Sequence, residues 1–244
     1  MGLPVASGGS IVFKSPMDIH SLNRRSWLAL AILATVGAHA AVPEKPAAFV
    51  TALAEKKQTI VAYGTSLTAG GAWVGQLTKA LEAKFPGRAT VINSGAGGMW
   101  SKWGLDNLDK RVISKAPDAV LIEWSINDAF LEYKTSPDDC RANLNTMLDR
   151  ILAAHPKCEI ILQVMNPPTG VHLERRPKIA DYEQVYREVA KARNLRLIDH
   201  APQWAAEIAK GEASWKALMP DGIHPNAKGC EQVMMPVLLK ALGI

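Results

Sequence analysis

The sequence of 244 residues predicts an α/β protein, a three-layer α/β/α sandwich built around a parallel sheet of about five strands. Short apolar runs rich in β-branched residues alternate with segments of helical periodicity. The connections between these runs are long enough for the crossovers that parallel strands need. A hydrophobic content of 48% allows one sizeable core. We therefore expect one domain over residues 59–244, after an export signal at 1–40 and a linker with a short helix at 41–58.

The predicted strands are apolar runs that stop at glycine or at polar residues. They cover residues 59–63, 89–93, 119–124, 159–165 and 195–199. Helical spacing of apolar residues predicts helices over 72–85, 105–115, 138–154, 179–194 and 228–242. Pro86-Gly87 ends the first of these helices, and Pro137 starts the third. A regular alternation of this kind is typical of a flavodoxin-like sheet.

The first forty residues have the pattern of an export signal rather than of a folded element. Arg24 and Arg25 precede an apolar run over residues 27–37, and Ala38-His39-Ala40 offers small residues at the positions that signal peptidase requires. Met17 fits as the true start. The apolar run is shorter than the roughly 20 residues of a membrane span, so we expect cleavage after Ala40 and no stable anchor. The arginine pair resembles a twin-arginine signal, and the choice between this route and the general one stays open.

Charge and cysteine content exclude several classes of protein. The formal charge is +5 and the pI is near 9.1, but lysine and arginine are scattered among acidic residues without a basic stripe, so we expect no nucleic-acid partner. No cysteine or histidine spacing is typical of a zinc site, and we expect neither a metal nor a cofactor. The three cysteines leave at least one thiol unpaired, and Cys140 and Cys158 flank a predicted helix that would hold them apart. Any pairing with Cys230 stays open.

The chain is organised around residues 59–71, where the first apolar strand stops at Gly64 and small hydroxylated residues lead into a helix. In a parallel sheet this turn lies at the carboxyl end of a strand, where ligands bind and where free backbone N–H groups favour negative charge. Ser66 in this turn is the candidate nucleophile. The alternative is that Thr65, Ser66 and Thr68 only cap the helix.

Two further loops are expected beside Ser66, because parallel strands all end at the same edge of a sheet. One is the glycine-rich loop Gly95-Ala96-Gly97-Gly98 after the second strand, and the other carries Asn127 after the third. Acyl transfer through serine needs hydrogen-bond donors for the oxyanion of the attacked carbonyl. A glycine N–H, the Asn127 amide and the Ser66 N–H would supply them. The alternatives are a tight glycine turn and a capping asparagine.

His224 is the best candidate for the base that takes the serine proton. Asp221 lies three residues before it in a turn that contains Gly222, so the carboxylate can bind one ring nitrogen while the other nitrogen faces a serine. None of the other histidines has an acid at this spacing within a glycine-containing turn. The alternative is that Asp221-Gly222 is an ordinary turn.

The order of these blocks resembles the SGNH hydrolases, also called the GDSL esterase/lipase superfamily, over essentially the whole chain after the signal. Gly64-Thr65-Ser66-Leu67 stands where that family has Gly-Asp-Ser-Leu, and Ser125-Ile126-Asn127-Asp128 stands where it has Gly-x-Asn-Asp. The resemblance implies a Ser-His-Asp triad and an oxyanion hole. The residues it assigns are Ser66, His224 and Asp221 for the triad, with Ser66, Gly98 (or Gly97 in the neighbouring register) and Asn127 for the oxyanion hole.

Two positions depart from the family pattern. Thr65 replaces the usual aspartate before the serine, and Ser125 replaces the usual glycine before the asparagine block. Neither departure removes a group that the mechanism requires. The missing second glycine of a G-x-S-x-G elbow, where this chain has Thr68, argues against the ordinary α/β-hydrolase fold.

These features predict a secreted serine esterase that hydrolyses short-acyl esters, with an acetyl ester on a carbohydrate as the expected substrate. Trp100 and Trp103 follow the glycine loop and could offer a surface to a sugar ring, or else pack into the core. A lysophospholipase or thioesterase of the same superfamily is the alternative. A non-catalytic, flavodoxin-like module that binds an anion at residues 64–71 is a hypothesis of another class, and it gives no role to the Asp221–His224 pair.

Overall fold

The computed structural model describes residues 45–244, and the predicted export signal lies outside them. Five parallel strands form one sheet in the order β2-β1-β3-β4-β5, which confirms the predicted fold class. The strands are β1 (Gln58–Gly64), β2 (Ala89–Asn93), β3 (Ala119–Glu123), β4 (Glu159–Val164) and β5 (Arg196–Asp199). Because the order reverses at β1, the loop after this strand lies at the switch point where open α/β sheets bind ligands.

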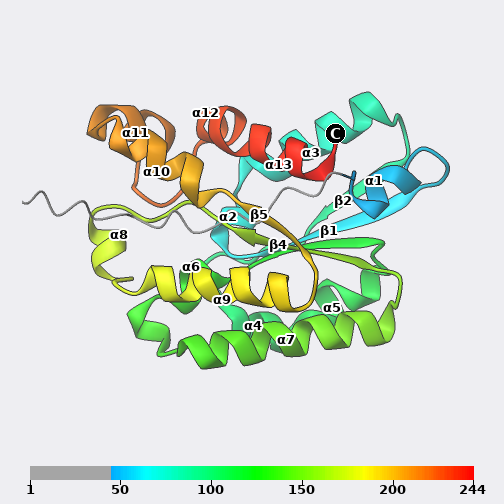
Figure 1. Cartoon of the computed structure of the whole chain (residues 1–244), viewed down its shortest axis with the longest axis horizontal. Helices are drawn as coiled ribbons and strands as arrows, with labels where there is room; N and C mark the ends of the chain where they lie inside the picture. Colours follow the sequence, from blue (N-terminus) through cyan, green and yellow to red (C-terminus); the bar gives the residue numbers. More distant parts are fainter. Residues whose placement is uncertain (1–44) are drawn as a thin grey trace, which may run out of the picture. The chain divides into compact units, whose positions relative to one another are not determined.

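Helices cover both faces of this sheet (Figure 1). One layer holds α4 (Ser101–Asp106), α5 (Leu108–Arg111), α7 (Pro137–Ala154) and α9 (Ile179–Ala192). The other holds α3 (Ala72–Lys84), α10 (Ala201–Ala209), α11 (Glu212–Leu218), α12 (Ala227–Gly229) and α13 (Met235–Leu242). A short helix, α1 (Ala48–Ala52), precedes β1. The long helix α7 begins with a capping box in which Ser136 and Asp139 bond each other's backbone N–H.

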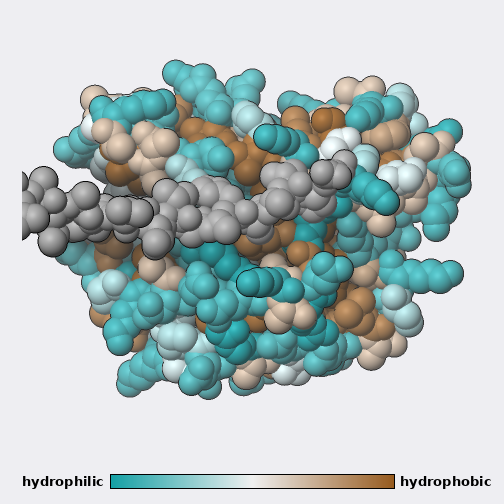
Figure 2. Space-filling view, in the orientation of Figure 1, coloured by the Kyte–Doolittle hydropathy of each residue, from teal (hydrophilic) through white to brown (hydrophobic). Residues whose placement is uncertain are grey.

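A single apolar core fills both interfaces between sheet and helices. Strand β3 is buried along its whole length, as a central parallel strand should be. The ring of Trp124 is fully buried and meets Tyr63 edge-on at 4.9 Å between ring centroids. On the face shown in Figure 2, hydrophilic residues are spread over both helical layers with hydrophobic residues between them. All three cysteines are buried and unpaired.

Two predicted helices are interrupted. The helix expected over 105–115 begins at Ser101, whose N–H donates to the buried carboxylate of Asp128 at 2.9 Å, and breaks at Asn107 before a 3₁₀ turn over Ile113–Lys115. The closing helix expected over 228–242 contains a π-helical turn over Cys230–Met234. We attribute that turn to Pro236, which has no N–H to donate to the α-helical ladder.

The sequence did not predict α10 and α11. They are nine and seven residues long, shorter than the stretch of about 11–18 residues over which apolar periodicity is recognised, and each has one buried residue, Trp204 in α10 and Leu218 in α11. Within residues 45–244, no helix is long and apolar enough to cross a membrane.

Candidate active site

The nucleophile turn joins β1 to α2 (Ser66–Ala69) at the switch point of the sheet. Thr65 is the N-cap of α2, because its hydroxyl accepts the N–H of Leu67 at 3.2 Å. Gly64 permits the close approach of β3, since a β-carbon at this position would overlap the Glu123 carboxyl group. Ser66 is therefore the first residue of a short helical turn, and its own N–H group has no acceptor among residues 45–244.

A fully buried carboxyl group, that of Glu123 at the end of β3, lies beneath this turn. It accepts hydrogen bonds from the N–H of Thr65 at 2.7 Å, the hydroxyl of Thr65 at 3.0 Å and the hydroxyl of Thr68 at 2.7 Å. Burial raises the pKa of Glu123 to about 8, although these hydrogen bonds act in the opposite direction. Thr65, the departure from the family pattern, thus ties the nucleophile turn to β3.

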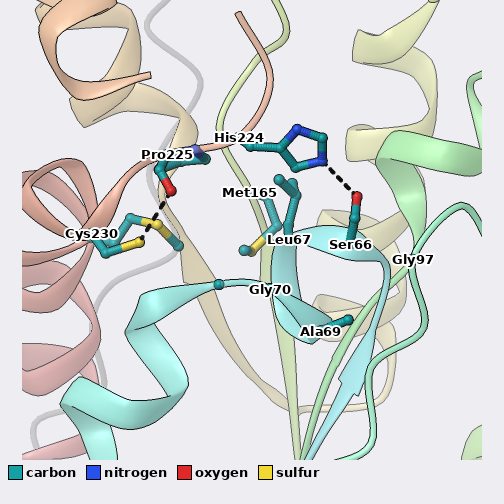
Figure 3. A pocket seen from close by; sticks show the side chains of 11 residues that line it. Ser66, Leu67, Ala69, Gly70, Gly97, Met165, His224, Pro225 and Cys230 are labelled. Carbon is teal, nitrogen blue, oxygen red and sulfur yellow. Dashed lines mark hydrogen bonds between the residues drawn. The ribbon is translucent and has the colours of Figure 1, made fainter. Parts of the chain in front are cut away.

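The structure brings Ser66, His224 and Asp221 into one hydrogen-bonded chain. His224 Nε2 lies 2.8 Å from Ser66 Oγ, and His224 Nδ1 lies 2.6 Å from Asp221 Oδ2. Figure 3 shows the imidazole above α2 with its edge turned to the serine hydroxyl. The side chains of His224 and Asp221 are 45% and 51% exposed, so the pair lies open to solvent.

The turn that carries Asp221 fixes the ionisation and direction of its carboxylate. Its Oδ1 accepts the N–H of His224 at 2.8 Å and that of Ile223 at 3.0 Å. Partial burial would raise the pKa of Asp221, but these bonds and the imidazole lower it to about 2. An ionised Asp221 requires a donor at His224 Nδ1, which leaves Nε2 as the acceptor for the serine proton. This tautomer is assigned from the hydrogen-bond network.

Asn127 lies in the short helix α6 (Ser125–Asp128), which follows β3, the strand beside β1, and is 5% exposed. Its Nδ2 donates to the carbonyl of Met99 at 2.8 Å, and its Oδ1 accepts from Arg176 Nη2 at 3.1 Å. The glycine loop and α6 are thereby joined. The second Nδ2 proton makes no hydrogen bond to residues 45–244.

The glycine loop adds further backbone donors at the same edge of the sheet. The N–H groups of Ser66, Gly97 and Gly98 have no acceptor within the part of the chain that the structure describes. Gly98 has a φ of +70°, a conformation that favours glycine, and its carbonyl accepts the hydroxyl of Tyr133. Gly97 lies in the wall of the pocket that contains Ser66. Both registers predicted for the oxyanion glycine therefore have a free N–H.

The two tryptophans predicted to contact substrate differ in their surroundings. Trp100 stacks on Tyr133, with ring centroids 4.5 Å apart and an angle of 14° between the planes. Trp103 packs against the core beside Trp124, and the Arg111 guanidinium lies 4.8 Å from its ring centroid. Trp100 thus lies against the tyrosine whose hydroxyl bonds the Gly98 carbonyl, whereas Trp103 has the surroundings of a core residue.

An apolar cavity of about 340 Å³ opens beside Ser66 on the side of the π-helical turn. Figure 3 shows Leu67, Met165, Pro225 and Cys230 around it. Its lining residues come from α2 and the turn after it, the glycine loop, the residue that follows β4 and the C-terminal segment: Ser66, Leu67, Ala69, Gly70, Gly71, Gly97, Met165, His224, Pro225, Cys230 and Met234. Neither here nor elsewhere do residues 45–244 contain a group of three or more His, Cys, Asp or Glu side chains suited to hold a metal ion.

Three residues that contact the site were not predicted from the sequence. Glu123 bonds Thr65, Tyr133 bonds the Gly98 carbonyl, and Arg176 bonds Asn127. For Glu123 a signal existed, because a charged residue in an otherwise apolar strand needs a partner. Tyr133 and Arg176 lie in connecting segments whose position depends on tertiary structure.

A comparison with known protein families shows which family the chain belongs to. Residues 62–232 match the model of the GDSL-like Lipase/Acylhydrolase family, and the chain therefore belongs to this family of hydrolases. No curated protein matches the sequence.

Solved structures with the same fold include three enzymes. A lipase/acylhydrolase from Enterococcus faecalis is 29% identical, with a TM-score of 0.61 over 76% of this chain and 92% of that one. An acetylxylan esterase from Geobacillus stearothermophilus is 22% identical, with a TM-score of 0.66 over 78% and 95%. An α/β hydrolase from the metagenome of Lake Arreo, Spain, is 23% identical, with a TM-score of 0.65 over 77% and 96%.

Proposed function

We propose that this hydrolase is a serine carboxylic-ester hydrolase. His224 takes the proton of Ser66, and the alkoxide attacks the ester carbonyl to form a tetrahedral intermediate. The N–H groups of Ser66 and Gly98 and the amide of Asn127 stabilise its oxyanion. His224 then gives the proton to the leaving alcohol, and a water molecule activated by the same imidazole hydrolyses the acyl-enzyme.

The hydrogen-bonded chain from Asp221 through His224 to Ser66 carries this proposal. Distances of 2.6 Å and 2.8 Å connect the loop after β1 with a turn 158 residues later in the sequence. Asp221, held ionised with a pKa of about 2, stabilises the imidazolium that forms when His224 takes the proton. An anion-binding module would not require this chain, because free N–H groups alone can hold an anion.

For the substrate, the expectation from the sequence is an acetyl ester on a carbohydrate, met by an exported enzyme. The fold shared with an acetylxylan esterase is compatible with this proposal. Export and cleavage after Ala40 remain part of it. Mass analysis of the mature N-terminus tests the cleavage, and a mature chain that still contains Arg24 and Arg25 would rule it out.

The apolar cavity beside Ser66 favours a second candidate, a hydrolase of longer acyl chains such as a lysophospholipase or thioesterase. Its volume of about 340 Å³ is within the range of about 300–1,000 Å³ that is usual for ligand pockets. The methyl group of an acetyl ester would fill little of it. Buried Leu67, Met165 and Met234 would instead contact a longer hydrocarbon chain.

Initial rates on p-nitrophenyl esters from acetyl to dodecanoyl test both proposals, with Ser66→Ala measured in parallel. We expect the variant to lose activity by about 10⁴-fold or more on every ester, because the nucleophile is gone. Rates that fall steeply with chain length support the acetyl ester, and rates that rise support the longer acyl chain. Full activity of a folded Ser66→Ala variant would contradict the esterase assignment.

A further inference from the structure

Arg176 is a buried arginine beside the proposed oxyanion hole. It is 6% exposed and lies just after the short helix α8 (Val171–Glu174). Its Nε donates to the carbonyl of Ile126 at 2.7 Å, while Nη2 donates to Oδ1 of Asn127 at 3.1 Å. One planar guanidinium therefore holds the main chain of α6 and the side chain of the next residue. The ring of Phe130 lies 4.7 Å from the guanidinium carbon.

The surroundings of Arg176 contain no counter-charge. Within residues 45–244 it forms no salt bridge, and its third hydrogen bond goes to the carbonyl of His172 at 3.3 Å. Burial and the neighbouring Arg175 lower the pKa of Arg176, but an arginine stays protonated in a protein. A buried cation without a carboxylate costs stability. Arg175, by contrast, is 47% exposed and paired with Glu132.

The contacts of Asn127 determine which way its amide group faces. An arginine can only donate hydrogen bonds, so the atom of Asn127 that faces Arg176 must be the oxygen. The carbonyl of Met99 can only accept, so the atom that faces it must be Nδ2. Arg176 and the Met99 carbonyl thus both oppose a rotation by 180° about the last side-chain bond, which would present an oxygen where the oxyanion needs a donor, and without Arg176 only the Met99 carbonyl opposes it.

We infer that Arg176 is a positioning residue that fixes the Asn127 amide with its N–H group available to the oxyanion. This inference rests on the proposed function. Arg176 contacts no reacting atom and acts only through Asn127. Its planar fork is essential, because a lysine ammonium is a point charge that cannot reproduce both bonds in one plane.

Steady-state kinetics of Arg176→Gln, Arg176→Lys and the neighbouring control Arg175→Gln test the inference. We expect Arg176→Gln to lower kcat by about 10- to 100-fold with KM changed less than about threefold, because a misplaced oxyanion donor affects mainly the transition state. Arg176→Lys keeps the charge and is expected to lose about tenfold. It serves as the test if Arg176→Gln does not fold. Arg175→Gln should keep kcat within about twofold.

A double-mutant cycle with Asn127→Ala separates positioning from a general structural role. In the Asn127→Ala background, Arg176→Gln should cost no more than about threefold in kcat, because the group it orients is gone. An equal loss in both backgrounds, or folded Arg176 variants with the kcat of the wild type, would overturn the inference.

Failure of the proposed function would look different, since the wild type itself would then show no Ser66-dependent turnover. In that case NMR of the Asn127 side-chain amide tests whether Arg176 positions this group. Its two proton resonances should shift in Arg176→Gln and stay in place in Arg175→Gln. Unchanged resonances in Arg176→Gln would overturn the inference.

Discussion

Two carboxyl groups flank the nucleophile turn, and their environments are opposite. Asp221 lies on an exposed turn, where two N–H groups and an imidazole lower its pKa to about 2. Glu123 is fully buried beneath the turn, and burial raises its pKa to about 8. Solvent access and hydrogen-bond donors, rather than proximity to the serine, thus decide which carboxyl group is ionised and can stabilise an imidazolium. The proposed catalytic role therefore falls to Asp221, whereas Glu123 holds the turn in place through Thr65 and Thr68.

Of substitutions at these two carboxyl groups, Asp221→Asn is expected to have the larger effect on activity. An amide can donate to Nδ1 of His224 and so favour the tautomer whose Nε2 carries the proton, and it cannot stabilise the imidazolium. We expect kcat/KM on a p-nitrophenyl ester to fall by about 10³-fold with little change in thermal stability. Asp106→Asn, an exposed surface substitution, is the control. Activity within tenfold of the wild type would mean that Asp221 does not support His224.

Glu123→Gln should leave activity within about threefold and change how stability depends on pH. The unfolded chain releases the Glu123 proton near pH 4.5 and the folded chain near pH 8, so the contribution of this group is complete below pH 4.5 and is lost as the pH rises toward 8. Glutamine resembles the neutral carboxyl group and does not titrate.

Urea unfolding of Glu123→Gln and of the wild type at pH 4.5 and pH 8.5 tests this pH dependence. The variant should be more stable than the wild type at pH 8.5 by on the order of 1–3 kcal/mol and about equal at pH 4.5. The same difference at both pH values would show that Glu123 does not titrate in this range.

Thr65→Val probes the link between the buried carboxyl group and the nucleophile. The substitution removes the hydroxyl that accepts the Leu67 N–H and donates to Glu123, at nearly constant volume. We expect a loss of about 1–2 kcal/mol in the free energy of unfolding, since a cap and a buried hydrogen bond are lost together. Thr78→Val is the matched control, because that hydroxyl bonds only a carbonyl of its own helix. Equal losses in both variants would argue against a special role for Thr65.

The smallest expected effect is a loss of stability at low pH, when Asp221 is protonated. Since the pKa of Asp221 is lowered from 3.8 to about 2, its contribution to stability is present above pH 3.8 and lost as the pH falls through 2. The side chain is half exposed, so solvent screening keeps this contribution below about 1 kcal/mol. Thermal unfolding of wild type and Asp221→Asn between pH 5 and pH 2 should therefore converge toward pH 2. A gap that widens with acid would contradict this assignment.

Most of the fold can be predicted from the sequence because each strand is a short apolar run with a clear end. Residues 89–93, for example, form β2 as predicted. It also identifies the residues that the structure brings together around Ser66, because parallel strands end at one edge and the Asp221–His224 pair is local in sequence. Arg176 and Tyr133 could not be found in this way, since their contacts join segments that only tertiary packing brings together. Helix α10 was missed because its nine residues are fewer than the roughly 11–18 over which apolar periodicity is recognised.

Covalent labelling with a fluorophosphonate tests the central claim, that Ser66 is a nucleophile activated by His224 and Asp221. The serine oxygen attacks phosphorus and displaces fluoride, which leaves a stable adduct. We expect one adduct per chain, on the tryptic peptide of residues 58–79 that contains Ser66, and none in Ser66→Ala. Asp221→Asn should be labelled far more slowly. An active enzyme labelled at another residue, or labelled at the same rate in Asp221→Asn, would contradict this account.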